Sequence, residues 1–243
     1  MLRVDDAHAL AQAAADEVAV AVSETAEPLI VFATGATPLG LFAELSGRVR
    51  SGALNLGGVR AVQLDEYLGL EPGDRRCLWD WLRRELLAPA GIDETKAIRF
   101  MLERVSADVA CAELDAAVAA AGGIDLAVLG LGPNGHVGFN EPPSPADSPT
   151  RSVRLAEESI AAGASYWGSR SDVPVEAVTL GLSTLLRARR IVLLVSGAHK
   201  REILHRTLTD APSADVPASL LRTAASFLVI ADVEALPLPP AVR

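Results

Sequence analysis

Cysteine is scarce in this chain: only two of its 243 residues are cysteines, Cys77 and Cys111, and both lie in stretches with a helical pattern. Neither has the paired spacing that a zinc site requires, so no metal site is expected from them. A reducing compartment would leave both side chains as thiols. We therefore interpret them as small core or half-exposed residues.

Positive charge is also in short supply. The chain has 22 lysines and arginines against 31 aspartates and glutamates, which gives a formal net charge of -9. Nucleic-acid backbones and anionic lipids are held chiefly by a surplus of Lys and Arg, so this balance opposes non-specific binding to either. We expect no nucleic-acid and no membrane partner, and an anionic substrate would need a locally positive pocket.

Long hydrophobic runs are absent, although half of the residues are apolar. The longest run lies near Ile191 to Val195, far below the ~18 residues of a membrane span. The first ten residues carry Arg3, Asp5 and Asp6 and lack the apolar core of a secretory signal. We therefore expect a cytoplasmic protein.

Short apolar runs alternate with longer amphipathic stretches, which is typical of repeated β-α units and a parallel sheet. The pattern predicts an α/β fold: a Rossmann-like open, mostly parallel sheet with helices on both faces, in a single domain over 1–243. The expected strands are Leu29 to Ala33, Val59 to Leu64, Ile98 to Leu102, Leu126 to Leu131, Val178 to Leu182, Ile191 to Val195 and Phe227 to Ile230. The expected helices are Asp5 to Val22, Leu39 to Val49, Leu78 to Leu87, Val105 to Ala120 and Lys200 to Leu208.

Proline is dense in only two segments, Pro142 to Pro149 and the tail Pro237 to Pro240. The first follows a motif described below, so we expect a loop that shapes the site rather than a linker between domains. For the tail we expect a surface position or a frayed end.

The first polar motif follows the first of these strands. Thr34, Gly35, Ala36, Thr37 and Pro38 should turn sharply and open a helix, with Pro38 suited to its first position. Free backbone N–H groups and two hydroxyls at the positive end of a helix form an anion site, for which phosphate is the obvious ligand. A simple capped helix start is an equally good interpretation of this motif alone.

The second motif, Asp65 and Glu66, follows the strand that ends at Leu64. Adjacent carboxylates in extended chain point to opposite sides, so one of them can face a cleft. Such a carboxylate can abstract a proton beside a carbonyl group if its surroundings raise its pKa toward neutrality. A solvated acidic pair at the start of a loop is the alternative interpretation.

The third motif places His136 among glycines 130, 132, 135 and 138, which let the backbone bend tightly around the imidazole. A histidine in such a loop suggests contact with a ligand. Glu141 could hold one ring nitrogen and leave the other for a substrate oxygen. A metal site is less favoured, because no His or Cys lies at ligand spacing from His136.

These three motifs resemble those of the glucosamine-6-phosphate deaminase (isomerising) family, within the superfamily shared with 6-phosphogluconolactonases. The resemblance covers nearly the whole chain. It depends on the segments 33–40, 64–70, 134–142, 179–186 and 196–200. The lactonase relatives typically carry Asp-Glu-Arg at the second motif, whereas this chain has Tyr67 there, and the run Phe139 to Pro142 matches the deaminase branch.

The resemblance implies an enzyme that converts an aminosugar phosphate, glucosamine 6-phosphate, into fructose 6-phosphate and ammonia. It implies that Asp65 moves a proton between C2 and C1, and that His136, oriented by Glu141 and flanked by Asn134, promotes ring opening. The turn of Thr34, Gly35, Ala36 and Thr37, together with Lys200, would hold the substrate phosphate. No cofactor is implied, because each step is proton transfer or amine departure.

Two positions depart from the family pattern. Asn134 stands where many members have Asp, which should lower the affinity of His136 for a proton. Ser165 stands where deaminases generally carry a phosphate-binding arginine. Either Arg151, Arg154 or Arg170 replaces it from nearby, or the substrate differs from the usual one.

The sequence therefore favours an aminosugar-phosphate isomerase and deaminase that works on a small-molecule substrate. Two alternatives stay open: a sugar-phosphate lactonase and a non-catalytic sugar-phosphate sensor. A homo-oligomer is compatible with the sequence, which does not determine the oligomeric state or the response to effectors.

Overall fold

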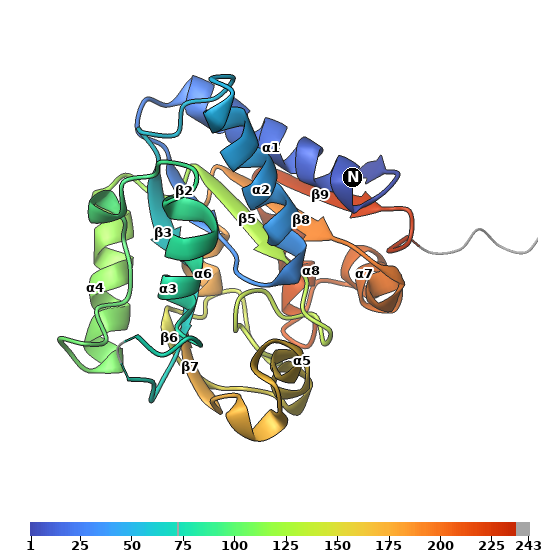
Figure 1. Cartoon of the computed structure of the whole chain (residues 1–243). Coiled ribbons are helices and arrows are strands. Elements are labelled where there is room, and N and C mark those ends of the chain that lie inside the picture. Colours follow the sequence, from blue (N-terminus) through green and yellow to red (C-terminus); the bar gives the residue numbers. More distant parts are fainter. Residues whose placement is uncertain (72, 237–243) are drawn as a thin grey trace, which may run out of the picture.

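The computed structural model describes residues 1–71 and 73–236. Six parallel strands form the main sheet (Figure 1). Their order across the sheet is β1 (Leu2–Val4), β9 (Phe227–Asp232), β8 (Arg190–Val195), β5 (Leu126–Gly130), β2 (Leu29–Phe32) and β3 (Arg60–Gln63). This confirms the predicted parallel sheet, and adds β1 at one edge. The predicted tail, Pro237 to Pro240, lies outside the described residues.

Both faces of the main sheet are buried at its central strands β2, β5 and β8, which are therefore nearly continuous apolar runs. Along β2, Leu29 and Val31 pack into one hydrophobic cluster, whereas Ile30 and Phe32 pack into another on the opposite face. The second cluster includes α1 (Ala7–Glu24) and α2 (Ala36–Arg50), which lie together on one face in Figure 1. The first cluster includes α4 (Ala107–Ala120), α6 (Leu182–Leu185), α7 (Arg201–Thr209) and α8 (Pro217–Leu220).

A second, three-stranded antiparallel sheet lies at one end of the molecule, next to α5 (Figure 1). It consists of β4 (Asp65–Tyr67), β7 (Glu176–Thr179) and β6 (Arg151–Arg154). Tyr67 and Ala177 from this sheet bury against Ile160 and Trp167 of α5 (Glu157–Trp167) in a third small cluster. Asp65 is therefore the first residue of β4, a strand separate from β3, which ends at Gln63.

Two predicted strands are wrong in part. The segment from Ile98 to Leu102 makes only an isolated bridge with Val62, because the Gln63 side chain accepts the Phe100 N–H (3.2 Å) where the next ladder bond would form. The strand predicted at Val178 to Leu182 is β7, which ends at Thr179 and pairs antiparallel with β4 and β6. Leu182 instead begins α6.

The predicted helices are confirmed with shifted ends. The helix predicted over Leu78 to Leu87 is α3 (Leu78–Leu82) continued by a π-helical segment (Arg83–Leu87). Helix α2 begins at Ala36, so Pro38 is its third residue rather than its first. This position is equally suited to proline, because the first four N–H groups of a helix have no partner within the helix.

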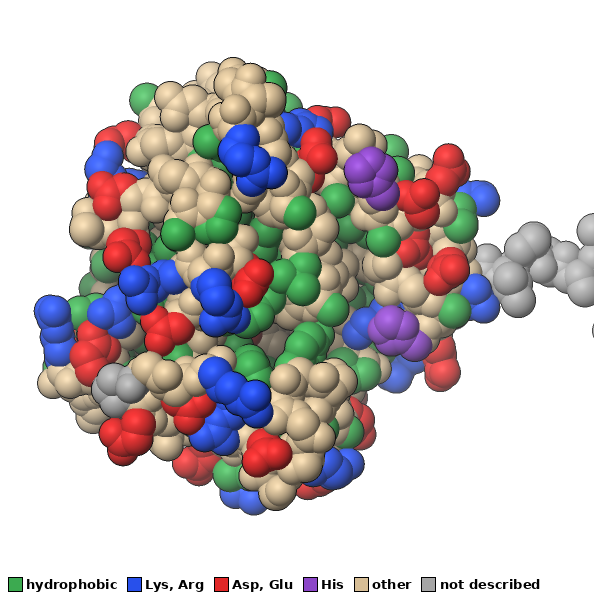
Figure 2. All heavy atoms as spheres, in the orientation of Figure 1, with side chains coloured by type: hydrophobic (Ala, Val, Ile, Leu, Met, Phe, Trp, Pro, Cys, Tyr) green, Lys and Arg blue, Asp and Glu red, His purple; other side chains and the backbone are tan. Residues whose placement is uncertain are grey.

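The part of the chain that the structure describes has no helix long and apolar enough to cross a membrane. Acidic and basic side chains are interspersed on the face drawn in Figure 2, where they form no single basic patch. This face therefore offers no concentrated positive charge to a nucleic acid or an anionic lipid surface.

Candidate active site

The main pocket opens at the carboxyl ends of the parallel strands, where β2 and β5 lie side by side. The next strand of the main sheet after β2 is β3, on one side, and the next one after β5 is β8, on the other. Such a divergence leaves a crevice between the two loops, which is where open α/β sheets bind ligands. All three sequence motifs contribute to its wall, which includes Thr34, Asp65 and His136.

The loop after β2 forms one end of this pocket. Thr34, Gly35, Ala36 and Thr37 all line it, at the N-terminus of the fifteen-residue helix α2. Gly35 has φ of 112°, a conformation that strongly favours glycine, and it lets the chain turn directly into the helix. The predicted anion cradle therefore faces the cavity. Lys200, at the start of α7, lines the same pocket, and burial lowers the pKa of its ammonium group.

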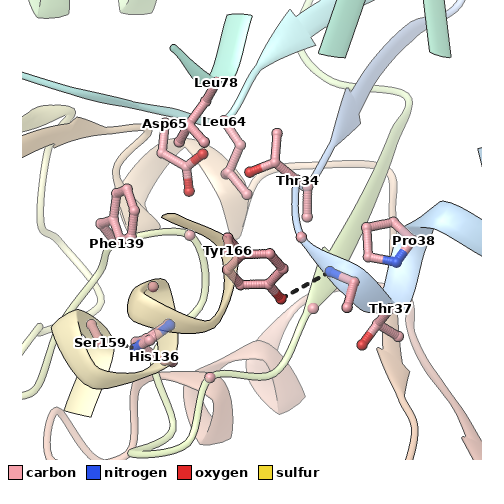
Figure 3. A pocket seen from close by; sticks show the side chains of 18 of the residues that line it. Thr34, Thr37, Pro38, Leu64, Asp65, Leu78, His136, Phe139, Ser159 and Tyr166 are labelled. Carbon is pink, nitrogen blue, oxygen red and sulfur yellow. Dashed lines mark hydrogen bonds between the residues drawn. The ribbon is translucent and has the colours of Figure 1, made fainter. Parts of the chain in front are cut away.

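Asp65 is only 5% exposed and projects into the pocket from the start of β4. Its Oδ1 has no hydrogen-bond partner among the described residues. Burial, and then the neighbouring charge of Glu66, raise the pKa of Asp65 to about 7, while the Thr34 hydroxyl opposes this rise. Figure 3 shows the Asp65 carboxylate and the Thr34 hydroxyl on the same side of the cavity. A carboxylate with such a pKa can both take and return a proton near neutral pH.

Glu66 points to the opposite side of the strand, as predicted for adjacent residues in extended chain. Its carboxylate accepts hydrogen bonds from the backbone N–H groups of Tyr67 (2.9 Å), Leu78 (2.8 Å) and Trp79 (2.8 Å), and from the Gln63 side chain (3.0 Å). Glu66 therefore ties β4 to the first turn of α3, and it does not line the pocket.

His136 forms the opposite wall of the pocket and is fixed by three contacts, with Gly132, Glu141 and Ser159. A Cβ on Gly132 would lie 2.2 Å from the ring, so only glycine lets the imidazole pack against this backbone. The His136 Nδ1 atom lies 3.3 Å from Glu141 Oε2 and 3.1 Å from Ser159 Oγ. Because an ionised carboxylate can only accept, Nδ1 carries the proton toward Glu141 and Nε2 remains for a ligand.

Glu141 and Asn134 stand behind the imidazole and do not line the pocket. Asn134 Nδ2 donates to Glu141 Oε2 (2.9 Å), and Asn134 Oδ1 accepts the His136 backbone N–H (3.2 Å). Although burial opposes ionisation of Glu141, the hydrogen bond and charge of His136 outweigh it and lower the pKa of Glu141 to about 2. The predicted pairing of Glu141 with His136 is thus present, with Asn134 as its hydrogen-bond partner.

The expectation that a nearby arginine replaces the family arginine is not met by this structure. Of the described residues that line the pocket, Lys200 is the one that is a Lys or an Arg. Arg151 instead donates to Asn140 (3.0 Å) and Ser144 (2.7 Å), and Arg170 pairs with Glu157. Arg154 is exposed at the end of β6 and does not line the pocket. Ser165 is exposed, and its hydroxyl donates to the Ala162 carbonyl of its own helix (2.7 Å).

The loop of Pro142 to Pro149 also differs from expectation, because none of its residues lines the pocket. Ser144 is fully buried and donates its hydroxyl to the Glu141 carbonyl oxygen (2.5 Å). This loop therefore supports the Glu141 backbone from behind. It shapes the site only indirectly.

Sequence reasoning missed α5, which supplies Ser159, Ala162, Gly163, Tyr166 and Trp167 to the pocket wall. The signal was present, because buried Ser159, Ile160, Gly163 and Trp167 recur at three- and four-residue spacing. It was weak because Ser and Gly are two of these four positions. Within the described residues, no group of three or more His, Cys, Asp or Glu side chains could hold a metal ion.

Comparisons with known proteins agree with this geometry. Residues 4–230 match the family model of glucosamine-6-phosphate isomerases/6-phosphogluconolactonase. A glucosamine-6-phosphate deaminase of Geobacillus sp. (strain WCH70) is 36% identical over 95% of this chain and 92% of its own. One of Rhodopirellula baltica is 40% identical over 82% of this chain and 80% of its own.

Solved structures give the same result. A monomeric glucosamine-6-phosphate deaminase superposes with a TM-score of 0.93 at 31% identity, over 96% of this chain and 97% of its own. A 6-phosphogluconolactonase of Thermotoga maritima, at a TM-score of 0.73 and 18% identity over 95% of this chain and 97% of its own, shares the fold. The chain therefore belongs to the family of glucosamine-6-phosphate isomerases and 6-phosphogluconolactonases.

Proposed function

We propose that this chain is a glucosamine-6-phosphate deaminase, which converts glucosamine 6-phosphate and water into fructose 6-phosphate and ammonia. The observation that carries the proposal is Asp65: a buried carboxylate with an unbonded oxygen, in one pocket with an anion cradle and an oriented imidazole. The full-length deaminase relatives and the 0.93 TM-score to a deaminase support the same reaction.

In this proposal the sugar phosphate lies across the pocket. The N–H groups and hydroxyls of the loop after β2, with Lys200, bind the phosphate at one end. His136, through Nε2, moves a proton between the anomeric hydroxyl and the ring oxygen, which opens the ring to the aldehyde. Glu141 stabilises the charged imidazole during this step, as a buried carboxylate does for a histidine base.

Asp65 then performs the proton transfer in the open chain. It removes the proton from C2, beside the aldehyde, while a proton of the C2 ammonium group passes to the aldehyde oxygen. It then returns its proton to C1, which leaves a hydroxymethyl group at C1 and an iminium group at C2. Water then adds to C2. The C–N bond breaks, its electron pair leaves with the ammonia, and a carbonyl group remains at C2. A pKa of about 7 suits Asp65 to both halves of this transfer, because neither protonation state is strongly disfavoured at neutral pH.

The test is to incubate the purified chain with glucosamine 6-phosphate and measure ammonia and fructose 6-phosphate together. We expect equal amounts of both products. Galactosamine 6-phosphate, mannosamine 6-phosphate and unphosphorylated glucosamine define the substrate range. 6-Phosphogluconolactone serves as the alternative substrate, because its hydrolysis needs no base at C2 and releases no ammonia.

Hydrolysis of the lactone without ammonia from any aminosugar phosphate would contradict the proposal and favour the lactonase alternative. Binding of glucosamine 6-phosphate without turnover would favour a sensor. The presence of a base beside the expected C2 position argues against a sensor, since binding alone requires no such group.

A further inference from the structure

Tyr166 stands at the phosphate end of the pocket, on the last turn of α5. Its hydroxyl oxygen accepts the backbone N–H of Ala36 at 3.0 Å, the contact drawn as a dashed line in Figure 3. A Cβ built on Gly35 would lie 3.6 Å from the same oxygen. Figure 3 shows the hydroxyl directed at the loop that contains Thr34 and Thr37. The phenol therefore belongs to the anion cradle by position.

The hydrogen bonds of this hydroxyl are only half used. A phenol has one O–H to donate and can also accept, and Ala36 uses the accepting side. Within residues 1–71 and 73–236, the structure gives the Tyr166 proton no acceptor. The Tyr166 side chain is 47% exposed and lines the pocket, so its O–H is free to turn toward a ligand there.

The charge of the site makes such a donor useful. A sugar phosphate carries close to two negative charges at neutral pH, whereas Lys200 is the one Lys or Arg among the described residues that line the pocket. Backbone N–H groups and the hydroxyls of Thr34 and Thr37 supply the remaining donors. A fixed phenol adds one hydrogen bond to a charged acceptor, the stronger class of hydrogen bond.

We propose that Tyr166 is a phosphate-binding residue of this enzyme: its hydroxyl accepts the Ala36 N–H and donates its own proton to the substrate phosphate. It thereby helps to distinguish a phosphorylated aminosugar from the free sugar. This inference rests on the proposed function for the identity of the substrate, but the phosphate contact itself can be tested without turnover.

The geometry also defines the competing behaviour. If a phosphate oxygen accepted the Ala36 N–H directly, the phosphate would have to displace the Tyr166 hydroxyl. Tyr166 would then compete with the phosphate, as a plug in the anion site, and would not bind it. The two behaviours give opposite results when the hydroxyl is removed. Loss of a ligand weakens phosphate binding, whereas loss of a plug strengthens it.

The experiment compares the wild type with Tyr166→Phe, which removes one oxygen and keeps the ring against Trp167. Ser165→Ala is the matched control, because it removes an exposed neighbouring hydroxyl that bonds only within α5. Calorimetry with inorganic phosphate gives Kd, and ammonia release from glucosamine 6-phosphate gives KM and kcat. The melting temperature of each variant checks its fold.

We expect Tyr166→Phe to raise the Kd for inorganic phosphate and the KM for glucosamine 6-phosphate about 10- to 100-fold, the usual effect of a hydrogen bond to a charged group. The kcat should change little, and Ser165→Ala should match the wild type. Unchanged or tighter phosphate binding by Tyr166→Phe, or a wild type that binds no phosphate, overturns the inference. Weaker phosphate binding in a chain that turns over no aminosugar phosphate supports Tyr166 while the proposed function fails.

Discussion

At the scale of single residues, Asp65 and Glu66 show how one step along a strand separates two carboxylates by function. Glu66 accepts four hydrogen bonds and connects β4 to α3. Asp65 faces the cavity with one oxygen unbonded. A buried acceptor without a hydrogen-bond partner lowers the stability of the fold. An acceptor left in this state indicates a functional role, such as catalysis.

The raised pKa of Asp65 predicts the pH dependence of turnover. Asp65 must be ionised to take the C2 proton, and its pKa is about 7. Because this pKa belongs to the free chain, kcat/KM for glucosamine 6-phosphate should be low at pH 5.5 and rise through a midpoint of about 7. A pH profile of kcat/KM checks this, and a kcat/KM that stays level from pH 5.5 to 8 would contradict the assignment.

Most of the polar residues of the site could be predicted from the sequence, because their positions follow from where strands end. Thr34, Asp65 and His136 each come after an apolar run, and in a parallel sheet these ends meet at one edge. The pairing of His136 with Glu141 was also predicted and is confirmed. The fate of the candidate arginine was not predictable, because Arg151 donates to Asn140 and Ser144, neither of which lines the pocket.

At the scale of elements, α5 is the part of the site that the motifs did not reveal. Helix α5 contacts both ends of the cavity: Ser159 in its first turn lies beside His136, and Tyr166 in its last turn lies beside Ala36. Its buried stripe is partly Ser and Gly, so its hydrophobic periodicity is weak. It had to be seen in the structure.

The loop after β8 carries Lys200 into the pocket and is fixed by Asp232 at the end of β9. The Asp232 carboxylate, 3% exposed, accepts from Ser196 Oγ (2.5 Å) and from the backbone N–H groups of Gly197 (3.1 Å) and Ala235 (2.9 Å). A single carboxylate thus holds together two chain segments beside the site. We interpret Asp232 as a residue that positions Lys200.

Asp232→Asn should loosen this loop, since an amide has one accepting oxygen in place of two and no charge. We expect KM for glucosamine 6-phosphate to rise about 3- to 30-fold, with kcat much less affected, because hydrogen bonds to a charged group are lost at the phosphate end. Steady-state kinetics measure this split.

Asp125→Asn is the matched control for this variant. Asp125 accepts the Leu29 N–H (2.8 Å) just before β5, at the amino ends of the strands and so away from the pocket. It should lose stability and keep its KM. A KM that is unchanged in Asp232→Asn, or that rises equally in both variants, would contradict a positioning role.

At the scale of the whole molecule, the main sheet follows from the alternation of apolar runs and amphipathic stretches, whereas the second sheet does not. Strand β4 has only three residues, Asp65 to Tyr67, and two of them are acidic. Its pairing with β7 joins segments more than a hundred residues apart. No local pattern marks such a pairing. The sequence pattern alone therefore places the strand at Val178 to Leu182 in the main sheet.

This second sheet matters because it carries Asp65 over the pocket. A carboxylate placed there costs stability as well as supplying the base. The folded chain holds the Asp65 proton up to its raised pKa of about 7, whereas the unfolded chain releases it near the ordinary pKa of 3.8. Stability therefore falls as pH rises between these values and does not recover above them, by on the order of a few kcal/mol.

The most direct test of the account is the rate of ammonia release from glucosamine 6-phosphate by Asp65→Asn beside the wild type at pH 8. The variant keeps the shape of the side chain and removes the base and the buried charge. Its melting temperature should equal or exceed that of the wild type, which separates lost chemistry from lost fold. We predict that kcat falls by about 10²- to 10⁴-fold with phosphate affinity retained. A folded Asp65→Asn variant with near wild-type kcat would contradict the account.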